Sequence, residues 1–445
     1  MRPTPERGTR FRLVDRAFDV DTGAAVFRYE LDGRALEELV QLPPGDATVD
    51  AATLDLLLDV AHVAVGTSYY KLSAPHRIEF ARPVTSQVLD LTRQTYDEGL
   101  RELAVTNGLP VPLESEIVAD TRPAPPSTHH GGAGGTGLLV PIGGGKDSAA
   151  VLSLLPGATG VTVSATPAQR RLTDAAVVRL LEVGRTLDPA LEALTRAGGY
   201  NGHIPITAIN SALAMLVAAL HGHGSVVFGN ERSANEPTRV AGGVPVNHQH
   251  SKSYAYEEGF AQATAASGIA YFSLLRRLSG LSVAGIVAAD HRLRGSFLSC
   301  NRAFVRSRRP DDPQTWCLEC PKCLSTFLSF APFLDVAEAE GIFGGNPLAD
   351  PRLTSGFAEL WDLDAKPFEC VAELAESAVA MAWLSTADGW RDHAVVVALA
   401  GDADRTATKL DAAMDDLLRP SGPHRVPDDL DALVESHAAA VRARR

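Results

Sequence analysis

Short apolar runs alternate with helical apolar patterns in the middle of the chain, between residues 137 and 229. We expect buried strands at 138–142, 160–165, 177–183 and 225–229. We expect helices at 151–155, 188–196 and 207–220. This alternation predicts an α/β fold with a parallel, doubly wound sheet, in which ligands bind beyond the carboxyl ends of the strands.

The patterns on either side of this core are different. Residues 1–120 predict an α+β domain, with strands at 11–20 and 24–31 and helices at 54–65 and 88–105. The stretch 121–136, rich in proline and then glycine, has the composition of a linker. Helices are expected at 357–363, 372–384, 394–399 and 411–418. The predicted domains are 1–120, a core at 137–345 and a helical region at 346–445.

Composition restricts the class of protein. The chain has 445 residues, 45% of them hydrophobic, and a net charge of −13, which disfavours non-specific binding to nucleic acids or anionic membranes. The first residues lack the apolar core of a signal peptide. The longest apolar stretch, 212–220, is shorter than the roughly 20 residues of a spanning helix. We therefore expect a cytoplasmic enzyme that binds neither nucleic acid nor membrane.

The sequence Gly-Gly-Gly-Lys-Asp-Ser at 143–148 lies between the first core strand and its helix. Glycines let the backbone approach an anion, and the N–H groups of a helix start bind phosphate. Asp147 is placed to hold a Mg²⁺ on the phosphates. A turn that only connects strand to helix is the alternative. The candidate nucleotide-binding residues are Gly143, Gly144, Gly145, Lys146, Asp147, Ser148 and, after the next strand, Thr166.

Two polar segments add candidate site residues. Asn230, Glu231 and Arg232 follow the expected strand at 225–229, where Glu231 could bind Mg²⁺ or act as a base and Arg232 could hold an anion. His248, His250 and Lys252 would share one face if their segment is extended, and we prefer a role in binding substrate, with Lys252 stabilising negative charge. A solvated charged loop is the alternative for the first segment.

Four of the five cysteines are clustered in the sequence, at Cys300, Cys317, Cys320 and Cys323. Cysteines at C-x-x-C spacing chelate one ion, and four thiolates form a closed, structural Zn²⁺ site. Free buried thiols and an iron–sulfur cluster are the alternatives. The fifth, Cys370, lies in Lys-Pro-Phe-Glu-Cys and could act as an acid or base if its pKa is lowered, or be a buried structural residue.

The loop at 143–148 resembles the Ser-Gly-Gly-x-Asp-Ser loop of the PP-loop ATP pyrophosphatases, which cleave ATP between its α and β phosphates. Gly143 replaces the usual first serine. The cysteine pattern looks like the zinc site of 7-cyano-7-deazaguanine synthase from that superfamily. The resemblance implies a PP-loop (HUP-like) core that uses ATP and Mg²⁺.

Later segments narrow this resemblance to one family. The blocks GGGKDS, NGHIPITAINSA, GNERSANEP, NHQHSKS, WCLECPKC and KPFEC, in this order, resemble the UDP-N-acetyl-α-D-muramoyl-L-alanyl-L-glutamate epimerases of peptidoglycan synthesis. The resemblance covers about residues 60–375. It implies an isomerase that inverts the terminal L-Glu of UDP-MurNAc-L-Ala-L-Glu through an acyl-adenylate, with ATP converted to AMP and pyrophosphate.

The resemblance also assigns roles to residues of this chain. Asp147 would hold Mg²⁺, and Lys252 and Arg232 would offset charge in the transition state. Inversion needs an acid and a base on opposite faces of the carbon. The candidates for this pair are Glu231, His248, His250, Lys366 and Cys370. Other PP-loop reactions, such as amide, nitrile or thiol transfer to a base or tRNA, and a non-catalytic nucleotide-binding regulator are the alternatives.

Overall fold

The structure, a computed structural model, describes residues 6–126, 137–304, 315–362, 364, 366–406 and 409–444. The main sheet consists of β1 (Arg10–Asp19), β2 (Ala24–Leu31), β3 (Arg34–Gln41), β4 (Arg77–Phe80), β5 (Glu116–Val118), β6 (Leu138–Pro141), β7 (Thr159–Val163), β8 (Leu180–Thr186), β9 (Ser225–Phe228) and β12 (Ala270–Ser273). Within the described residues, these ten strands lie in the order β12-β9-β6-β7-β8-β3-β2-β1-β4-β5. A separate hairpin pairs β10 (Arg239–Ala241) with β11 (Val244–Val246).

Five strands form a parallel half of the sheet, in the spatial order β8-β7-β6-β9-β12, with β12 at the edge. Chain order runs outward from β6 in one direction through β7 and β8, and in the other through β9 and β12. The connections therefore reverse direction between β6 and β9. In open parallel sheets such a reversal leaves a crevice at the carboxyl ends of the two strands.

Alternate residues of these strands enter two separate hydrophobic cores because successive side chains point to opposite faces of a strand. Val140 and Val227 lie in the core that contains α4 (Lys146–Leu154), α5 (Pro167–Ala176) and α9 (Gly280–Ala289). Leu139 and Val226 lie in the core that contains α1 (Ala51–Tyr70), α7 (Ile206–Leu220) and α8 (Tyr254–Thr264). The sheet is therefore covered by helices on both faces.

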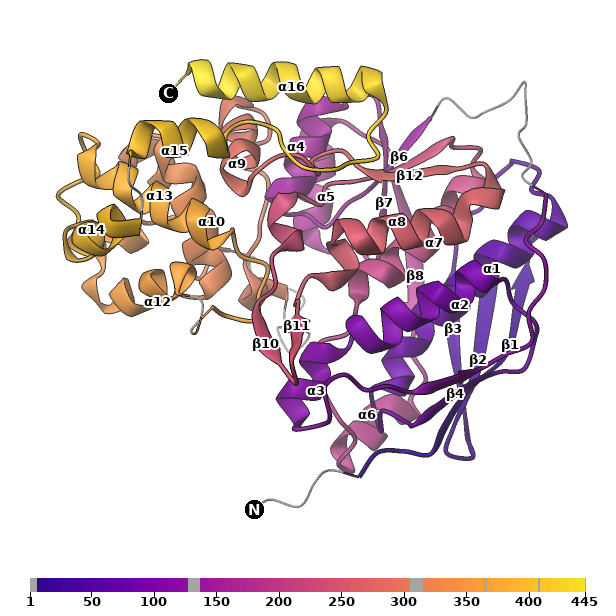
Figure 1. Cartoon of the computed structure of the whole chain (residues 1–445). Coiled ribbons are helices and arrows are strands. Elements are labelled where there is room, and N and C mark those ends of the chain that lie inside the picture. The colour runs from indigo at the N-terminus through magenta and orange to yellow at the C-terminus, as the bar shows by residue number, and fades with distance from the viewer. Residues whose placement is uncertain are drawn as a thin grey trace.

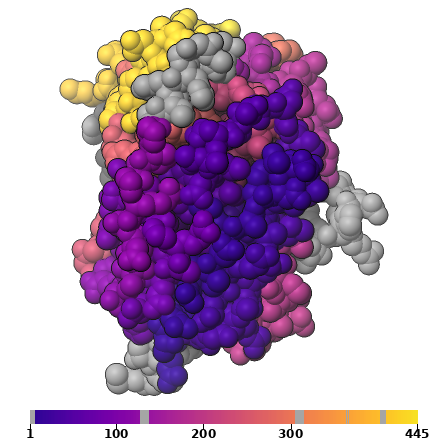
Figure 2. All heavy atoms as spheres, turned by 90° about the vertical axis from the view of Figure 1, so that its right-hand side faces the viewer, coloured from indigo at the N-terminus to yellow at the C-terminus, as the bar shows by residue number. Residues whose placement is uncertain are grey.

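The N-terminal strands extend the same sheet. Strand β3 pairs antiparallel with β8, and β2 and β1 follow as a meander. The remaining elements of this region are α2 (Ser86–Arg93), a π-helical turn (Gln94–Glu98), α3 (Arg101–Asn107) and, from the core, α6 (Ala190–Arg196). Figure 2 shows that N-terminal residues form most of the face that it presents. The domain boundaries expected from the sequence stay predictions, and residues 127–136 of the expected linker lie outside the described residues.

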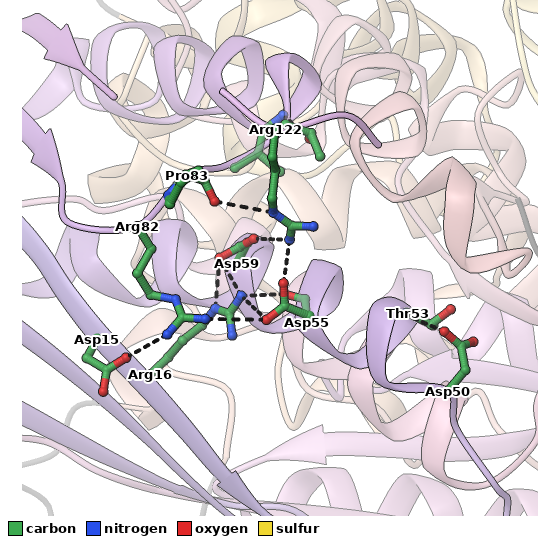
Figure 3. Close-up of polar contacts among 11 residues, drawn as sticks. Asp15, Arg16, Asp50, Thr53, Asp55, Asp59, Arg82, Pro83 and Arg122 are labelled. Carbon is green, nitrogen blue, oxygen red and sulfur yellow. Dashed lines mark hydrogen bonds and ion pairs between the residues drawn. The ribbon is translucent and has the colours of Figure 1, made fainter. Parts of the chain in front are cut away.

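A buried ion network joins the first strand to α1 and to the end of the N-terminal region (Figure 3). Asp59 accepts hydrogen bonds from Arg16 Nε at 2.8 Å and from Arg122 Nη2 at 2.7 Å, one on each carboxylate oxygen. Asp55 also bonds both arginines. The Arg16 and Asp59 side chains are each 4% exposed. The network thus fixes β1 and Arg122 to the same helix.

The C-terminal part of the chain is helical and packs beside the sheet, away from the N-terminal strands (Figure 1). Its helices are α10 (Pro321–Phe330), α11 (Val336–Phe343), α12 (Thr354–Ala358), α13 (Leu374–Thr386), α14 (Ala394–Thr406), α15 (Leu410–Leu417) and α16 (Asp428–Ala443). Helix α10 contacts α9 and α13, so this helical region continues the core behind α4 and α9.

The expected α/β class and the mostly parallel sheet are confirmed, whereas the PP-loop type of the core stays a prediction. The strand expected from Val177 is wrong at its start: Val177 ends α5 in a left-handed conformation, φ +56°, and β8 begins at Leu180. The single helix expected at 88–105 is divided by the π-helical turn. Among the described helices α1 is long and apolar enough to cross a membrane, but 78% of its most apolar window is buried, as in core helices generally.

Candidate active site

The glycine loop lies at the carboxyl end of β6, directly before α4. Gly144 has φ +84°, and a Cβ atom on Gly145 would lie 2.7 Å from Ser299 Oγ, so both positions require glycine. The Gly143 N–H donates to Ser148 Oγ at 2.9 Å, which closes the turn. Helix α4 begins without a side-chain cap. Its first N–H groups therefore offer a site for an anion such as phosphate.

A cavity of about 260 Å³ opens beside this loop. Its wall combines the loop with the end of β9, the segment before α8, the start of α10 and the segment at 370–372. Of the residues expected from the sequence, those that line it are Gly143, Gly145, Lys146, Asp147, Ser148, Asn230, Glu231, Lys252 and Cys370. The topology therefore brings together residues that are up to 227 positions apart, from Gly143 to Cys370.

Lys146 connects the loop to the end of β9. Its ammonium donates to Asp147 Oδ1 at 2.6 Å and to Glu231 Oε1 at 2.5 Å. Burial lowers the pKa of Lys146, but the attraction of the two carboxylates outweighs it and the net pKa is raised. Burial raises the pKa of Glu231. Glu231 is only 7% exposed, and its Oε2 atom has no hydrogen-bond partner among the described residues.

Lys252 and Cys370 form a second polar pair in the cavity wall. The Lys252 ammonium lies 3.3 Å from the Cys370 sulfur, and it also interacts with the charge of Asp147. Burial alone would raise the pKa of the Cys370 thiol. The cation of Lys252 and a hydrogen bond from His248 outweigh burial, so the pKa is lowered well below its usual value. The arrangement favours the thiolate form of Cys370 next to the glycine loop.

His248 lies behind Cys370 and is held on its other side by Glu102, whose Oε2 is 2.5 Å from His248 Nδ1. Burial lowers the pKa of His248, but hydrogen bonds to Cys370 and Glu102 outweigh it and raise the pKa to about 9. The ring of His203 packs against that of His248 at a centroid distance of 4.3 Å. Glu102, His203 and His248 also place three potential metal-ligand atoms within 4.8 Å of one another.

Apart from the cysteine cluster, six predicted residues lie outside the lining of the cavity: Gly144, Thr166, Arg232, His248, His250 and Lys366. His250 is in a 3-10 turn, so its segment is not extended, and its ring faces Glu98 and Tyr256. Arg232 donates to Glu373 at 3.1 Å. Thr166 caps α5. His248 contacts the cavity only through Cys370.

The four clustered cysteines come together in space. Their sulfur atoms all lie within 4.8 Å of one another, and those of Cys317 and Cys323 are 3.7 Å apart. Sulfur atoms about 2.3 Å from one tetrahedral Zn²⁺ would be about 3.8 Å apart, so the donor set fits this ion. The backbone N–H of Cys320 also donates to the Cys317 sulfur at 3.4 Å.

The cysteine cluster is adjacent to the cavity. Ser299, next to Cys300, accepts a hydrogen bond from the Lys146 backbone at 3.3 Å. Lys322, between two of the cysteines, lines the cavity and contributes to the low pKa of Cys370. A metal ion bound there would fix both segments.

Several residues of the cavity were not expected from the sequence: Gln169, Asn210, Ser299 and Lys322. Arg276, 1% exposed, does not line the cavity but supports its wall: it donates to the backbone oxygens of Glu231 and Lys252 and to the carboxylate of Glu257. An isolated arginine in a sequence carries no signal for such a role.

Comparison with known proteins gives family relationships along nearly the whole chain. The model of the MurL N-terminal domain matches residues 3–274, and that of the MurL C-terminal domain matches residues 296–414. No solved structure gives a significant match.

Three relatives carry the name UDP-N-acetyl-α-D-muramoyl-L-alanyl-L-glutamate epimerase. The chain is 39% identical to that of a Micromonospora species, over 94% of this chain and 96% of the relative. It is 38% identical to that of Salinispora tropica, over 96% of both chains, and 36% identical to that of Xanthomonas oryzae pv. oryzae, over 94% of this chain and 95% of the relative. The two domain matches and these identities show that the chain belongs to the MurL family.

Proposed function

We propose that this chain is an isomerase that inverts the terminal L-glutamate of UDP-MurNAc-L-Ala-L-Glu to D-glutamate, in cytoplasmic synthesis of the peptidoglycan precursor. The names of the three relatives support this substrate and reaction. The observation that carries the proposal is the single cavity that a phosphate-type loop shares with Lys252 and Cys370.

The chemistry explains why an inversion would need a nucleotide. The α-proton beside an ionised carboxylate is very weakly acidic because its loss puts a second negative charge on the same group. We propose that the carboxylate first attacks the α-phosphorus of ATP and displaces pyrophosphate. The resulting acyl-adenylate carries no charge on the reacting carbonyl. Its α-proton can then be removed and replaced on the opposite face, and hydrolysis releases AMP.

The residues of the loop fit a nucleotide. The N–H groups at the start of α4, with Ser148, would hold phosphate oxygens. Asp147 has a partly exposed carboxylate in the cavity and would hold Mg²⁺, which neutralises phosphate charge when bound. Gly143, in place of the serine of related loops, leaves room in the turn.

Lysine side chains around the cavity suit the charge that the reaction develops. Lys146 and Lys252 approach from two sides, and both ammonium groups interact with Asp147. They would stabilise the leaving pyrophosphate and the enolate oxygen. Arg232 is held by Glu373, so we assign it no direct contact with the substrate.

One incubation tests this function. The protein is mixed with ATP, Mg²⁺ and UDP-MurNAc-L-Ala-L-Glu, and AMP and D-glutamate are measured after acid hydrolysis. We expect both products in equal amounts. AMP without D-glutamate would indicate another ATP-cleaving transferase in place of the epimerase. The absence of both products would favour a nucleotide-binding regulator.

We also propose a structural Zn²⁺ at Cys300, Cys317, Cys320 and Cys323, supported by the distances between their sulfur atoms. Metal analysis of the purified protein should give about one Zn²⁺ per chain. Cys323→Ser should lose that ion and melt at a lower temperature than the unchanged protein. A protein that contains no zinc and has four freely titratable thiols would contradict the assignment.

A further inference from the structure

The inversion needs groups that exchange a proton with the α-carbon, and five side chains are candidates from the sequence. The cavity separates them. His250 and Lys366 do not line it: His250 faces Glu98, and Lys366 is bonded to Glu236. His248 stands behind Cys370. Only Glu231 and Cys370 of the five reach the cavity.

The surroundings of Glu231 and Cys370 differ in the partners that each side chain has. Glu231 Oε1 is bound by Lys146, while its buried Oε2 lacks a partner among the described residues. A Cβ atom on Gly280 would lie 3.2 Å from this oxygen and 3.0 Å from Glu376 Oε2, so Oε2 faces the start of α9 and a second carboxylate. Cys370 has a different environment, because the groups that lower the pKa of its thiol are positive or donate a hydrogen bond: Lys252, His248 and the nearby Lys322. The carboxylate of Glu369 also interacts with its charge.

The position of Lys252 relates Cys370 to the nucleotide loop. The Lys252 ammonium interacts with Asp147 at the loop and with the Cys370 sulfur. An acyl-adenylate whose phosphate lies at the loop would place its carbonyl oxygen near Lys252. The α-carbon, one bond beyond the carbonyl, would then lie toward Cys370.

A chain of side chains holds the sulfur in place. His248 interacts with Cys370, its Nδ1 lies 2.5 Å from Glu102 Oε2, and His203 packs on its ring. Because Glu102 fixes the orientation of the imidazole, His248 presents an N–H to the sulfur. Glu102, His248 and Lys252 are therefore positioning residues for one reactive atom.

We infer that Cys370 is the catalytic residue that exchanges the α-proton on one face of the activated glutamate. This inference rests on the proposed epimerase function and assigns one member of its acid–base pair. As a base, the thiolate takes the proton, the C–H bond breaks, an S–H bond forms, and the electron pair moves into the acyl-adenylate as an enolate. An acid on the other face then gives the carbon a proton, and Cys370 returns its own proton to solvent.

Cys370→Ser tests the inference, because serine keeps the shape but is a far weaker acid. The reaction is run in D₂O, and the ratio of D-glutamate to AMP is measured with the deuterium content of recovered glutamate. We expect the ratio to fall at least about 100-fold, which is within the usual range for a general base. Undeuterated L-glutamate would make Cys370 the group that removes the L-proton. Deuterated L-glutamate would make it the group on the D-face.

The outcomes are distinguishable from failure of the function itself. If the unchanged protein makes AMP but no D-glutamate, the epimerase proposal fails. If the unchanged protein makes both and Cys370→Ser keeps the same ratio, the inference on Cys370 is wrong. It is also wrong if AMP and D-glutamate fall together, because Cys370 would then serve adenylation or folding. Lys366→Gln, at another buried site in the same segment, is the matched control and should keep the ratio.

Alkylation gives a readout that does not depend on turnover. Iodoacetamide labelling of Cys370, followed by mass spectrometry across pH, should have a midpoint below that of an ordinary thiol. Lys252→Met and His248→Gln should each move this midpoint upward. A midpoint that is ordinary in the unchanged protein and insensitive to both variants would overturn the assignment.

Discussion

Two buried groups of charges in this molecule differ in what they leave unpaired. In the network around Asp59, each carboxylate oxygen has an arginine partner, and the same two arginines also bind Asp55 (Figure 3). Around the cavity, Glu231 has one oxygen without a hydrogen-bond partner among the described residues, and the Lys252–Cys370 pair lines the open space. Removing one partner from buried charges that satisfy one another destabilises a fold, whereas buried charges that line a cavity are available to a ligand.

The first variant should have the largest effect and acts on the cavity. We expect Asp147→Ala to lower AMP formation by about 10²–10³-fold, the usual cost of losing one group that stabilises transition-state charge. The measurement is AMP release at saturating ATP, with the melting temperature as a check on folding. Asp55→Asn in the other network should keep AMP release per folded molecule. A fully active Asp147→Ala would refute its role as a metal ligand.

The second variant breaks the other network. Asp59→Ala leaves Arg16 with only Asp55 as its carboxylate partner, so we expect a loss of about 3 kcal/mol in the free energy of unfolding, measured in urea. Turnover per folded molecule should not change. If Asp59→Ala kept its free energy of unfolding but lost turnover, the network around Asp59 would serve activity, contrary to this prediction.

The third prediction concerns pH. The pKa of His248 is raised from 6.5 to about 9, so its contribution to stability is complete below pH 6.5 and is lost as pH rises through 9. The pKa of Cys370 is lowered from 9.0, so its contribution is present above pH 9 and is lost as pH falls through the lowered value. Between pH 6.5 and pH 9, His248 and Cys370 together hold one proton in the folded protein and one proton in the unfolded protein. The two effects on the free energy of unfolding should therefore cancel in this range, and the pair should not make stability depend on pH.

His248→Gln removes the pH-dependent contribution of His248 to stability and leaves that of Cys370. Relative to the unchanged protein, its free energy of unfolding should therefore rise with pH between about 6.5 and 9, by up to about 1.4 kcal/mol per pH unit. Urea unfolding at several pH values measures the difference. Glu102, His203 and Lys252 face the pair in both proteins. Parallel stability curves would mean that Cys370 and His248 do not form an ion pair.

The smallest effect is expected at the edge of the first network. Arg82 is 50% exposed and pairs with Asp15 and Asp55. Because exposed ion pairs contribute little, Arg82→Ala should cost less than about 1 kcal/mol. A loss in urea unfolding as large as that of Asp59→Ala would show that the outer arginine is part of the buried network.

Local patterns in the sequence predict the strand, glycine loop and helix around 138–155, and the structure places them there. Local patterns do not predict the secondary structure of segments whose conformation depends on contacts with distant residues. Arg34–Gln41 is rich in helix formers, yet it forms β3 because Leu36 and Val40 enter the core and Glu38 pairs with Arg185. Burial alternates along this strand but hydrophobicity does not, since Glu38 is buried and Leu39 is 40% exposed, so a period of two could not identify it from the sequence.

The candidate site shows the same limit. Single motifs suggest Cys370, Lys252 and His248, but sequence spacing does not indicate that they meet, because Glu102 and Cys370 lie in the predicted first and last domains. Arg276 is beyond prediction for a related reason. Two of its partners are backbone oxygens, which any sequence provides, and the others are the side chains of Glu257 and Ser273, so only the fold identifies it.

The central claim is that the glycine loop activates the carboxylate whose α-carbon is then inverted. The most direct test uses UDP-MurNAc-L-Ala-L-Glu labelled with ¹⁸O in the terminal α-carboxylate, with mass analysis of the AMP produced. Attack of the carboxylate on the α-phosphorus, followed by attack of water on the carbonyl carbon, leaves one labelled oxygen in AMP. We predict one ¹⁸O per AMP. AMP without label, formed alongside D-glutamate, would contradict the claim.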